Sequence, residues 1–481
     1  MPKPIPSLRT IVSRIAIDTT PLRESRDLRR LITGGFISNI GTQAALVALP
    51  FQLYDESHSA LAVGMLGAAE LVPLITMALL GGALADRVDR RKLLLFDQIG
   101  LVACSATLAA LAFSGWSPIA MLYLIGALLA GFGSVQNVAR GAIVPNLIAP
   151  ERLRSALALN YGLQSLSLVI GPGLGGLVIA AGGVGTAYAI DAISCFALVF
   201  AVIEMAPQPP GHTTFKADGA TADVEVVDVG ADTGTVAADA RPAAEAPNPT
   251  TTSAPEPQES IGRSIADGLR FVRSKPALLG SFAIDLSAMT FGMPRTLFPV
   301  MAVSIYHAGA SGTGLLYAAV SAGSTVAALT TGWLARTRKL GIVVIWAVVA
   351  WGGAIAIAGL AGSIWIAAFM LAVAGAADSV SAVCRSTINQ TVTPDIMRGR
   401  MSAVFSLVVT SGPRLGDIES GTVASLTTTR FSVVSGGVAT IVAAGLLAVS
   451  VPALARYDAE VAIAEAEALE RDLAGGTPRT V

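Results

Sequence analysis

A small set of ionisable residues lies deep inside long apolar stretches of this sequence. Four of them are carboxylates that could exchange protons or bind a cation: Glu70, Asp285, Asp378 and Asp417. A carboxylate in a partly dehydrated cavity can take up and release a proton as the cavity opens to one side and then to the other. Asp285 is the first candidate for a proton or cationic-substrate site, and the other three stand behind it.

Other charges in the same stretches allow a purely structural interpretation. Asp285 and Arg295 are too far apart to meet on one helix, but either could form an ion pair across helices. Arg414 and Asp417 have the i,i+3 spacing at which side chains on a helix interact, and Glu419 follows closely. Buried charges need partners, so Arg414, Asp417 and Glu419 are expected to form a structural network.

Composition places these charges in a membrane. Of the 481 residues, 53% are hydrophobic and 14% are charged, against roughly 25% charged residues in soluble domains. The chain is therefore an integral membrane protein, in which an unpaired and unhydrated charge costs several kcal/mol and is a functional candidate by default. The net charge of −1 carries no signature of polyanion binding, so no nucleic-acid partner is expected.

Apolar runs of about 20 residues, long enough to cross a bilayer as helices, occur about twelve times. The fold class is therefore an all-α membrane protein with two six-helix bundles. The predicted spans are 31–53, 60–83, 93–113, 118–139, 156–180 and 184–206 in the first half, and 276–303, 311–335, 341–360, 363–384, 401–426 and 432–454 in the second.

The two halves repeat one another around their fourth and fifth spans. Residues 138–159 resemble residues 383–407, with Arg140 matching Arg385 after the fourth span of each half. Six plus six spans with an internal repeat are typical of a transporter that alternates access around a central site.

The distribution of Lys and Arg predicts the orientation. Basic residues gather in the loops on the side of the N-terminus and are nearly missing from the others, which places both termini in the cytoplasm. The predicted segments are 1–30 as a cytoplasmic N-terminal segment, 31–206 and 276–455 as the two bundles, 207–260 as a disordered acidic cytoplasmic linker, 261–275 as an amphipathic interfacial helix, and 456–481 as a cytoplasmic tail.

The linker is rich in Pro, Ala, Thr and acidic residues and has few large apolar ones, so it cannot bury enough surface to fold alone. A simple tether is the first interpretation, and a regulatory docking segment is the alternative.

The stretch "GGALADRVDRRKLL" (81–94) concentrates charge between the second and third spans. It resembles the G-x-L-A-D-R-x-G-R-R loop of the major facilitator superfamily, except that Asp89 replaces the usual Gly. The resemblance covers nearly all of the chain apart from the linker and the tails. It implies that Asp86 latches the two bundles in the outward-facing state, with Gly82, Arg87, Arg90 and Arg91 around it. The alternative is that the loop's basic residues only fix topology.

A second motif concerns the direction of transport. "GPGLGG" contains Gly171, Pro172, Gly175 and Gly176 and is similar to the G-P-x-x-G-G motif of antiporters in this superfamily, which are exporters. Its glycines allow another helix to approach closely, and its proline removes a helix donor. Generic packing of small residues is the competing explanation.

Within the superfamily, the chain resembles the drug-efflux branch that contains the bacterial enterobactin exporter and macrolide-efflux proteins. In that fold the first, fourth, seventh and tenth spans line the cavity, so Asp285 and Asp378 would face it. The resemblance implies proton-coupled export of an amphiphilic small molecule, a drug or siderophore-like metabolite, from a monomer in the bacterial inner membrane. A nutrient importer of the same fold and a transport-inactive sensor or scaffold are the alternatives. No enzyme motif, cofactor site or metal-ligand spacing is found in the sequence.

Overall fold

The computed structural model describes residues 20–85, 87–208, 261–394 and 397–462, which are helical and contain no strand. The first half comprises α2 (Thr20–Glu24), α3 (Arg26–Ser57), α4 (Ala60–Ala85), α5 (Arg90–Ser114), α6 (Ile119–Ile143), the short turns η1 (Val144–Leu147) and η2 (Pro150–Arg152), and α7 (Leu153–Ile203). The second half comprises α9 (Pro276–Phe291), α10 (Leu297–Val300), η3 (Met301–Ile305), α11 (Gly309–Thr330), η4 (Thr331–Arg336), α12 (Leu340–Leu360), α13 (Ile364–Val392), α14 (Arg398–Leu426), α15 (Thr429–Ser450) and α16 (Pro452–Ala455).

Every predicted span falls on a helix or on successive helical segments of the described residues. Nine of the described helices are long and apolar enough to cross a membrane, which identifies a multi-pass membrane protein. α7 contains the fifth and sixth spans, which meet at Gly183, a non-helical residue with φ 78°. The seventh span is broken, because α9 ends at Phe291 and α10 begins only at Leu297.

Local chemistry explains several helix ends. The Ser25 side chain accepts a hydrogen bond from the Leu28 amide, so α3 begins five residues before the predicted span. Asp89 caps α5 in the same way through the Arg91 amide. At the other end of α5, Gly115 adopts φ 68°, a left-handed conformation that glycine accepts without strain.

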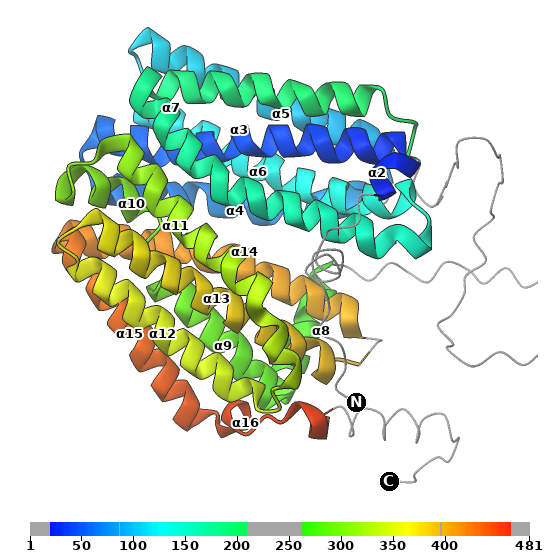
Figure 1. The fold of residues 1–481 in the computed structure, drawn as a ribbon, viewed down its shortest axis with the longest axis vertical. Coiled ribbons are helices and arrows are strands. Elements are labelled where there is room, and N and C mark those ends of the chain that lie inside the picture. The colour runs from blue at the N-terminus through cyan, green and yellow to red at the C-terminus, as the bar shows by residue number, and fades with distance from the viewer. Residues whose placement is uncertain (1–19, 86, 209–260, 395–396, 463–481) are drawn as a thin grey trace, which may run out of the picture.

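The two halves form separate helix bundles that touch mainly along two pairs of helices, α4 with α14 and α7 with α11 (Figure 1), with smaller contacts of α10 and α11 on α3 and of α10 on α4. Both crossings are made by glycines. A Cβ on Gly64 would lie 2.9 Å from the Gly421 Cα, and a Cβ on Gly176 would lie 2.8 Å from the Gly314 Cα. Backbones this close leave no room for side chains, as is common where membrane helices pack through small residues.

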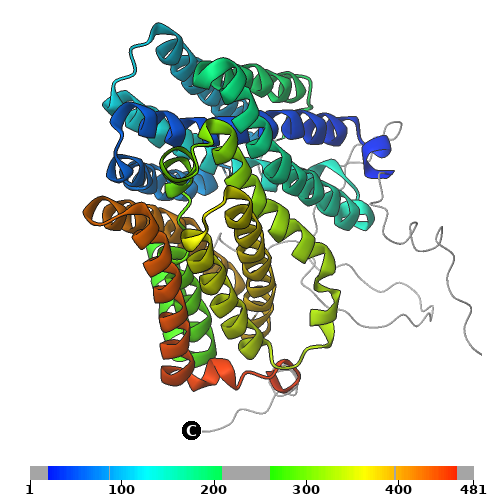
Figure 2. The ribbon, with the colours of Figure 1, turned by 60° about the vertical axis from the view of Figure 1, so that its left-hand side comes forward.

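Both glycine crossings lie near one end of the molecule, which we call the hairpin side because the α3–α4 and α14–α15 connections are there. The opposite end, where α7 ends and α8 (Ile261–Ser274) begins, is the linker side. The halves meet at the hairpin side and diverge toward the linker side (Figure 2). Consistently, an added Cβ on Gly82 or Gly332, near the linker side, would meet no atom within 4 Å.

Helix α8 packs against the first turns of α14. Gly268 faces the Arg400 carbonyl, Asp267 lies 3.6 Å from the Arg400 guanidinium, and Val272 is buried. The predicted interfacial helix at 261–275 corresponds to this element. Most of the predicted linker (207–260), the larger part of the N-terminal segment (1–30) and the end of the tail (456–481) lie outside the described residues.

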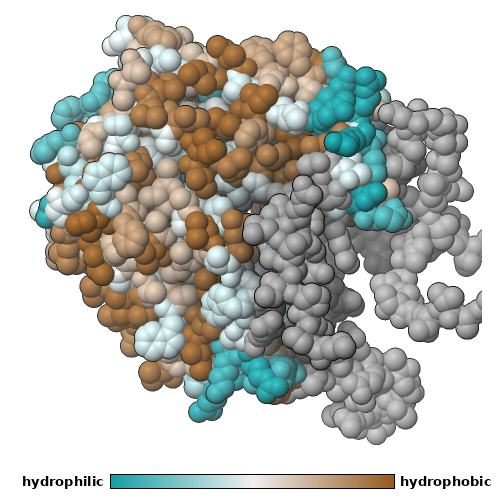
Figure 3. All heavy atoms as spheres, viewed as in Figure 1, coloured by the Kyte–Doolittle hydropathy of each residue, from teal (hydrophilic) through white to brown (hydrophobic). Residues whose placement is uncertain are grey.

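The outer surface of the helices matches a lipid environment. Apolar side chains cover the middle of the face seen in Figure 3, and hydrophilic ones gather toward the linker side. Large apolar residues such as Leu177, Ile193 and Phe369 are more than half exposed to their surroundings, which is expected when those surroundings are acyl chains.

Candidate functional site

One group of charges joins the two halves; we call it the interface cluster. It consists of Glu70 on α4, Thr296 in the broken seventh span, and Arg414 and Asp417 on α14. The Arg414 guanidinium lies 2.7 Å from a Glu70 carboxylate oxygen and 3.4 Å from an Asp417 oxygen. The Thr296 hydroxyl donates a hydrogen bond to Asp417. The cluster thus contains an ion pair across the interface between the halves.

The glycine crossing of α4 and α14 positions this cluster. A Cβ on Gly67 would lie 2.7 Å from the Asp417 Cβ and 2.9 Å from the Arg414 carbonyl oxygen. Because position 67 has no side chain, α14 comes close enough for Arg414 to reach Glu70, three residues further along α4. Helix α9 ends at Phe291, so the residues that follow are not held in its helical path, and Thr296 can lie next to Asp417.

A second group of charges lies wholly in the second half; we call it the α13 cluster. It consists of Asp285 on α9 with Asp378, Ser381 and Arg385 on α13. The Arg385 guanidinium lies 2.9 Å from an Asp285 oxygen and 3.7 Å from an Asp378 oxygen, and it donates a hydrogen bond of 3.0 Å to Ser381. The Asp285 side chain is 2% exposed and that of Asp378 is 24% exposed, so within this cluster Asp378 is the more accessible carboxylate.

Asp285 forms an ion pair across helices, as the sequence allowed. Its partner is Arg385 and not Arg295, because α13 continues to Val392 and carries Arg385 inside the helix instead of just after it. One sequence prediction about these charges was wrong. Glu419 does not join Arg414 and Asp417: its Oε2 is buried without a hydrogen-bond partner among the described residues. Glu70, which the sequence had placed among the proton-site candidates, takes that position.

The counterpart of Arg385 in the first half has a different neighbour. Arg140 on α6 lies against Gly35 on α3, where a Cβ would collide with the guanidinium. No ion pair of Arg140 is found among the residues that the structure describes. Arg140 and Arg385 therefore occupy matching positions in the two halves of the sequence, but their side chains have different neighbours.

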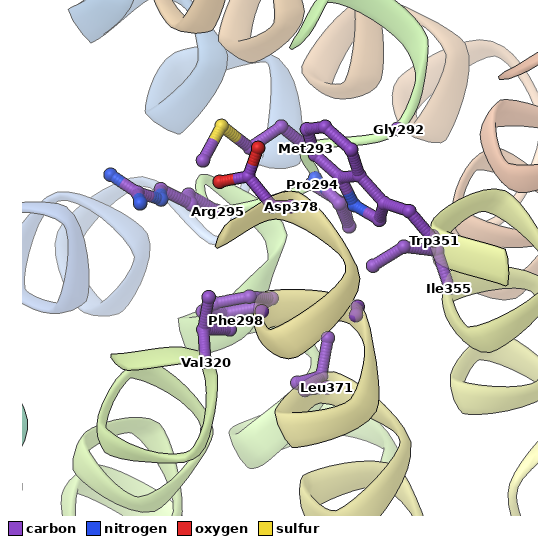
Figure 4. Close-up of a pocket in the computed structure, with 12 residues that line it drawn as sticks. Gly292, Met293, Pro294, Arg295, Phe298, Val320, Trp351, Ile355, Leu371 and Asp378 are labelled. Atoms are coloured by element: carbon purple, nitrogen blue, oxygen red, sulfur yellow. The ribbon is translucent and has the colours of Figure 1, made fainter. Parts of the chain in front are cut away.

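The broken seventh span carries Arg295 and borders a small pocket (Figure 4). The pocket is lined by apolar side chains, among them Met293, Phe298 and Trp351, together with Arg295 and Asp378. The cavity volume of the pocket is about 20 Å³, which is space for one or two water molecules. In this form the pocket is too small for a drug-sized molecule.

The basic loop binds the ends of helices in its own half. Arg90 donates to the Ala142 carbonyl at 3.0 Å, and Arg91 donates to the Val202 carbonyl at 2.9 Å. Gly82 faces open space and Arg87 is exposed. Asp86, the predicted latch residue, lies outside the described residues.

The GPGLGG segment makes two kinds of contact. Gly171 and Gly175 pack against Gln43 and Ala44 of α3, within the first half, whereas Gly176 forms the crossing with α11 of the second half. The carbonyl of Pro172 also approaches Gly314. The predicted tight contact between the halves is therefore made by the end of the motif that lies nearer the hairpin side.

A third polar group lies within the first half, around Asp191 of the sixth predicted span. The Asp191 carboxylate accepts hydrogen bonds from Ser105 at 2.6 Å and from Thr42 at 3.1 Å, and it is almost fully buried. Asp97 on α5 is also fully buried, and neither of its oxygens has a hydrogen-bond partner among the described residues. Both residues follow apolar runs without a distinctive spacing, so only tertiary packing reveals their surroundings.

Comparisons with known proteins agree with this architecture. The profile of the Major Facilitator Superfamily matches residues 31–416. The enterobactin exporter of Citrobacter koseri is 27% identical over 437 residues, covering 89% of this chain and 92% of the relative, and that of Escherichia coli O81 is 26% identical over 441 residues, covering 89% and 92%.

Solved structures share the fold at low identity. A bacterial homologue of the human lysosomal transporter Spinster, inward-facing and unoccupied, has a TM-score of 0.63 at 12% identity and covers 93% of this chain and 98% of its own. A nucleoside transporter has a TM-score of 0.62 at 14% identity and covers 88% and 99%. With two helix bundles that meet at glycine crossings and a family match over most of its length, this chain belongs to the major facilitator superfamily.

Proposed function

We propose that this transporter exports an amphiphilic small molecule in exchange for protons, by alternating access between its two halves. The observation that carries the proposal is the ion pair between Glu70 of the first half and Arg414 of the second, beside the glycine crossing. The printed names of relatives, enterobactin exporters, support the outward direction. The GPGLGG segment at the second crossing supports it as well.

The distribution of basic residues supports placing the linker side in the cytoplasm. Arg87, Arg90, Arg91 and Lys92 lie on this side, as do Arg338 and Lys339, and cytoplasmic loops of membrane proteins carry an excess of Lys and Arg. With this orientation the halves are closed toward the outside and diverge toward the cytoplasm, so the structure corresponds to the inward-facing form. A latch at Asp86 would act in the other, outward-facing form.

The interface cluster links opening to proton uptake. When the hairpin side opens, α14 moves away from α4 and Arg414 leaves Glu70. Arg414 still keeps a partner, because Asp417 lies on the same helix at 3.4 Å. Glu70 loses its cation, and a carboxylate in a low-dielectric setting without a counter-charge is neutralised by a proton.

The return step then releases that proton. As the halves close on the hairpin side, Arg414 comes back to Glu70 and stabilises the ionised carboxylate. The proton leaves toward the open cytoplasmic side. Because the ionised pair holds an empty transporter inward-facing, only substrate binding supplies the free energy to separate it, which couples outward substrate movement to inward proton movement.

This mechanism favours Glu70 over Asp285, which the sequence analysis placed first. All four members of the α13 cluster belong to the second half. If the halves move as bodies, Asp285 keeps Arg385 in every state, so its charge has less reason to change.

Four strains test the proposal: the deletion strain and three complemented strains. Cells that lack the gene are complemented with wild type, Glu70→Gln or Glu419→Gln, and metabolites retained in cells and released to the medium are compared with and without a protonophore. We expect the deletion and Glu70→Gln strains to retain a metabolite that wild type and Glu419→Gln release, and the protonophore to abolish the difference. Depletion of a metabolite from the medium by wild type would instead identify an importer, and normal release by Glu70→Gln would contradict the coupling role.

A further inference from the structure

Arg295 is the feature that the mechanism above does not use. It lies in the break of the seventh span, between α9 and α10, and its side chain is exposed. Its guanidinium has no hydrogen bond or ion pair among the described residues. A cation at membrane depth is costly unless it is paired or hydrated, so an unpaired arginine here needs either water or a ligand.

The nearby carboxylates have other groups beside them. Asp417 is held by Thr296 and Arg414, and an Asp378 oxygen lies 3.7 Å from the Arg385 guanidinium without accepting a hydrogen bond. Arg295 is near enough for its charge to act on both Asp378 and Asp417, but it contacts neither. It therefore remains available to an anion from outside the protein.

The backbone around Arg295 is fixed although its head group is free. The Tyr317 hydroxyl donates to the Arg295 carbonyl at 3.0 Å, and the side chain of the next residue, Thr296, is bound to Asp417. Broken transmembrane segments of this kind commonly form the substrate sites of transporters. A held backbone with a free guanidinium is a preorganised arrangement for binding, because less freedom is lost when a ligand arrives.

The pocket beside Arg295 indicates the shape of the ligand. In Figure 4, Arg295 and Trp351 lie on opposite sides with Asp378 between them, and Met293 and Phe298 add apolar walls. Space for one or two waters is enough for a single small polar group. The apolar walls suit the chain or ring that carries that group.

From these observations we infer that Arg295 recognises an acidic group, such as a carboxylate, on an amphiphilic substrate. This inference rests on the proposed transport function and narrows its substrate class. A guanidinium group binds a carboxylate through two parallel hydrogen bonds. Lysine retains the positive charge of arginine but cannot form this pair of hydrogen bonds.

Binding to the purified full-length protein in nanodiscs tests this without a proton gradient. The probes are 11-(dansylamino)undecanoic acid and its primary amide, which share one body and differ in charge. The other four tryptophans are replaced by Phe, so that fluorescence energy transfer to the dansyl group comes from Trp351 alone. The signal of empty nanodiscs is subtracted.

We expect the acid to bind about ten- to a hundredfold more tightly than the amide, the range given by one charge-assisted contact. Arg295→Gln should remove this preference, Arg295→Lys should keep part of it, and Arg430→Gln, which changes an exposed arginine on the hairpin side, should keep all of it. Thermal unfolding confirms that each variant is folded. Equal binding of acid and amide by wild type, no binding of either, or an undiminished preference in Arg295→Gln would overturn the inference.

Glu70→Gln separates this inference from the proposed function. The acid preference should persist in Glu70→Gln while proton coupling is lost. If Glu70→Gln transports with normal coupling, the proposed function fails and the acid preference still stands. If coupling depends on Glu70 and the acid preference is missing, only the role of Arg295 fails.

Discussion

The interface cluster and the α13 cluster contain the same kinds of groups: one arginine between two carboxylates, with a hydroxyl side chain bound to one of the charges. In the interface cluster, Glu70 comes from one half and Arg414 from the other. In the α13 cluster, Asp285 and Arg385 both belong to the second half. The two clusters have similar chemistry, and we propose that their roles differ because the interface that moves during transport passes through only one of them.

The largest expected effect is on stability, from Arg385→Gln in the α13 cluster. It leaves the buried Asp285 without a cation, and breaking a buried pair in this way costs about 3–5 kcal/mol. We expect a clearly lower unfolding temperature in detergent, and recovery in the double variant Asp285→Asn/Arg385→Gln. An unfolding temperature equal to that of wild type would contradict the description of this cluster as a stabilising one.

The next effect is on coupling, from Glu70→Gln in the interface cluster. In proteoliposomes with the substrate found by metabolite profiling, gradient-driven transport should fall about tenfold or more, equivalent to at least about 1.4 kcal/mol. Exchange of labelled for unlabelled substrate should continue. Transport by Asp285→Asn should still depend on the proton gradient, even if the transport rate falls. Glu419→Gln, which removes a carboxylate from α14, serves as the matched control. Loss of gradient dependence in Asp285→Asn alone would reverse the assignment of the two clusters.

Closure of the hairpin side can also be perturbed at the second glycine crossing, between α7 and α11. Gly314→Val places a branched side chain against Gly176, where even a Cβ would lie 2.8 Å from the Cα. Overpacking costs about 1–3 kcal/mol, so the form that is closed on the hairpin side should be depopulated. Labelling of Ser59→Cys from outside should become faster. Gly445→Val, at a position with no atom near an added Cβ, should leave the rate unchanged.

The smallest effects come from the two hydroxyls. Thr296→Val and Ser381→Ala each remove one hydrogen bond to a charged group that keeps another partner, so we expect a loss of about 1 kcal/mol. Thr296→Val should change transport kinetics severalfold, since its bond holds the seventh span to α14. Ser381→Ala should change only the unfolding temperature. Equal effects of both variants on transport would weaken the distinction between the clusters.

The sequence predicted the helices better than the partners of the charges. Each predicted span falls on a helix or on successive helical segments of the described residues. The Gly-Pro segment indicated a close helix contact, which the structure shows at Gly176. Arg414 and Asp417 were correctly paired, because their i,i+3 spacing on one helix is a local property.

Contacts between distant helices could not be predicted in this way. Glu70 meets Arg414 only because glycines bring α4 and α14 together, and Asp285 meets Arg385 only because α13 extends past its apolar run. The break before α10 was also missed. The apolar stretch 276–303 continues through it, and hydropathy does not register a loss of helical backbone.

The distance between the halves on the hairpin side tests the central claim most directly. Spin labels at Glu56→Cys and Thr427→Cys, both exposed positions, are measured by pulsed dipolar spectroscopy in nanodiscs, with the three native cysteines replaced. We expect a short distance for wild type and Glu419→Gln, and an added longer distance for Glu70→Gln, which lacks the ionised pair. Identical distance distributions in Glu70→Gln and wild type would contradict the claim that the Glu70–Arg414 pair holds the hairpin side closed.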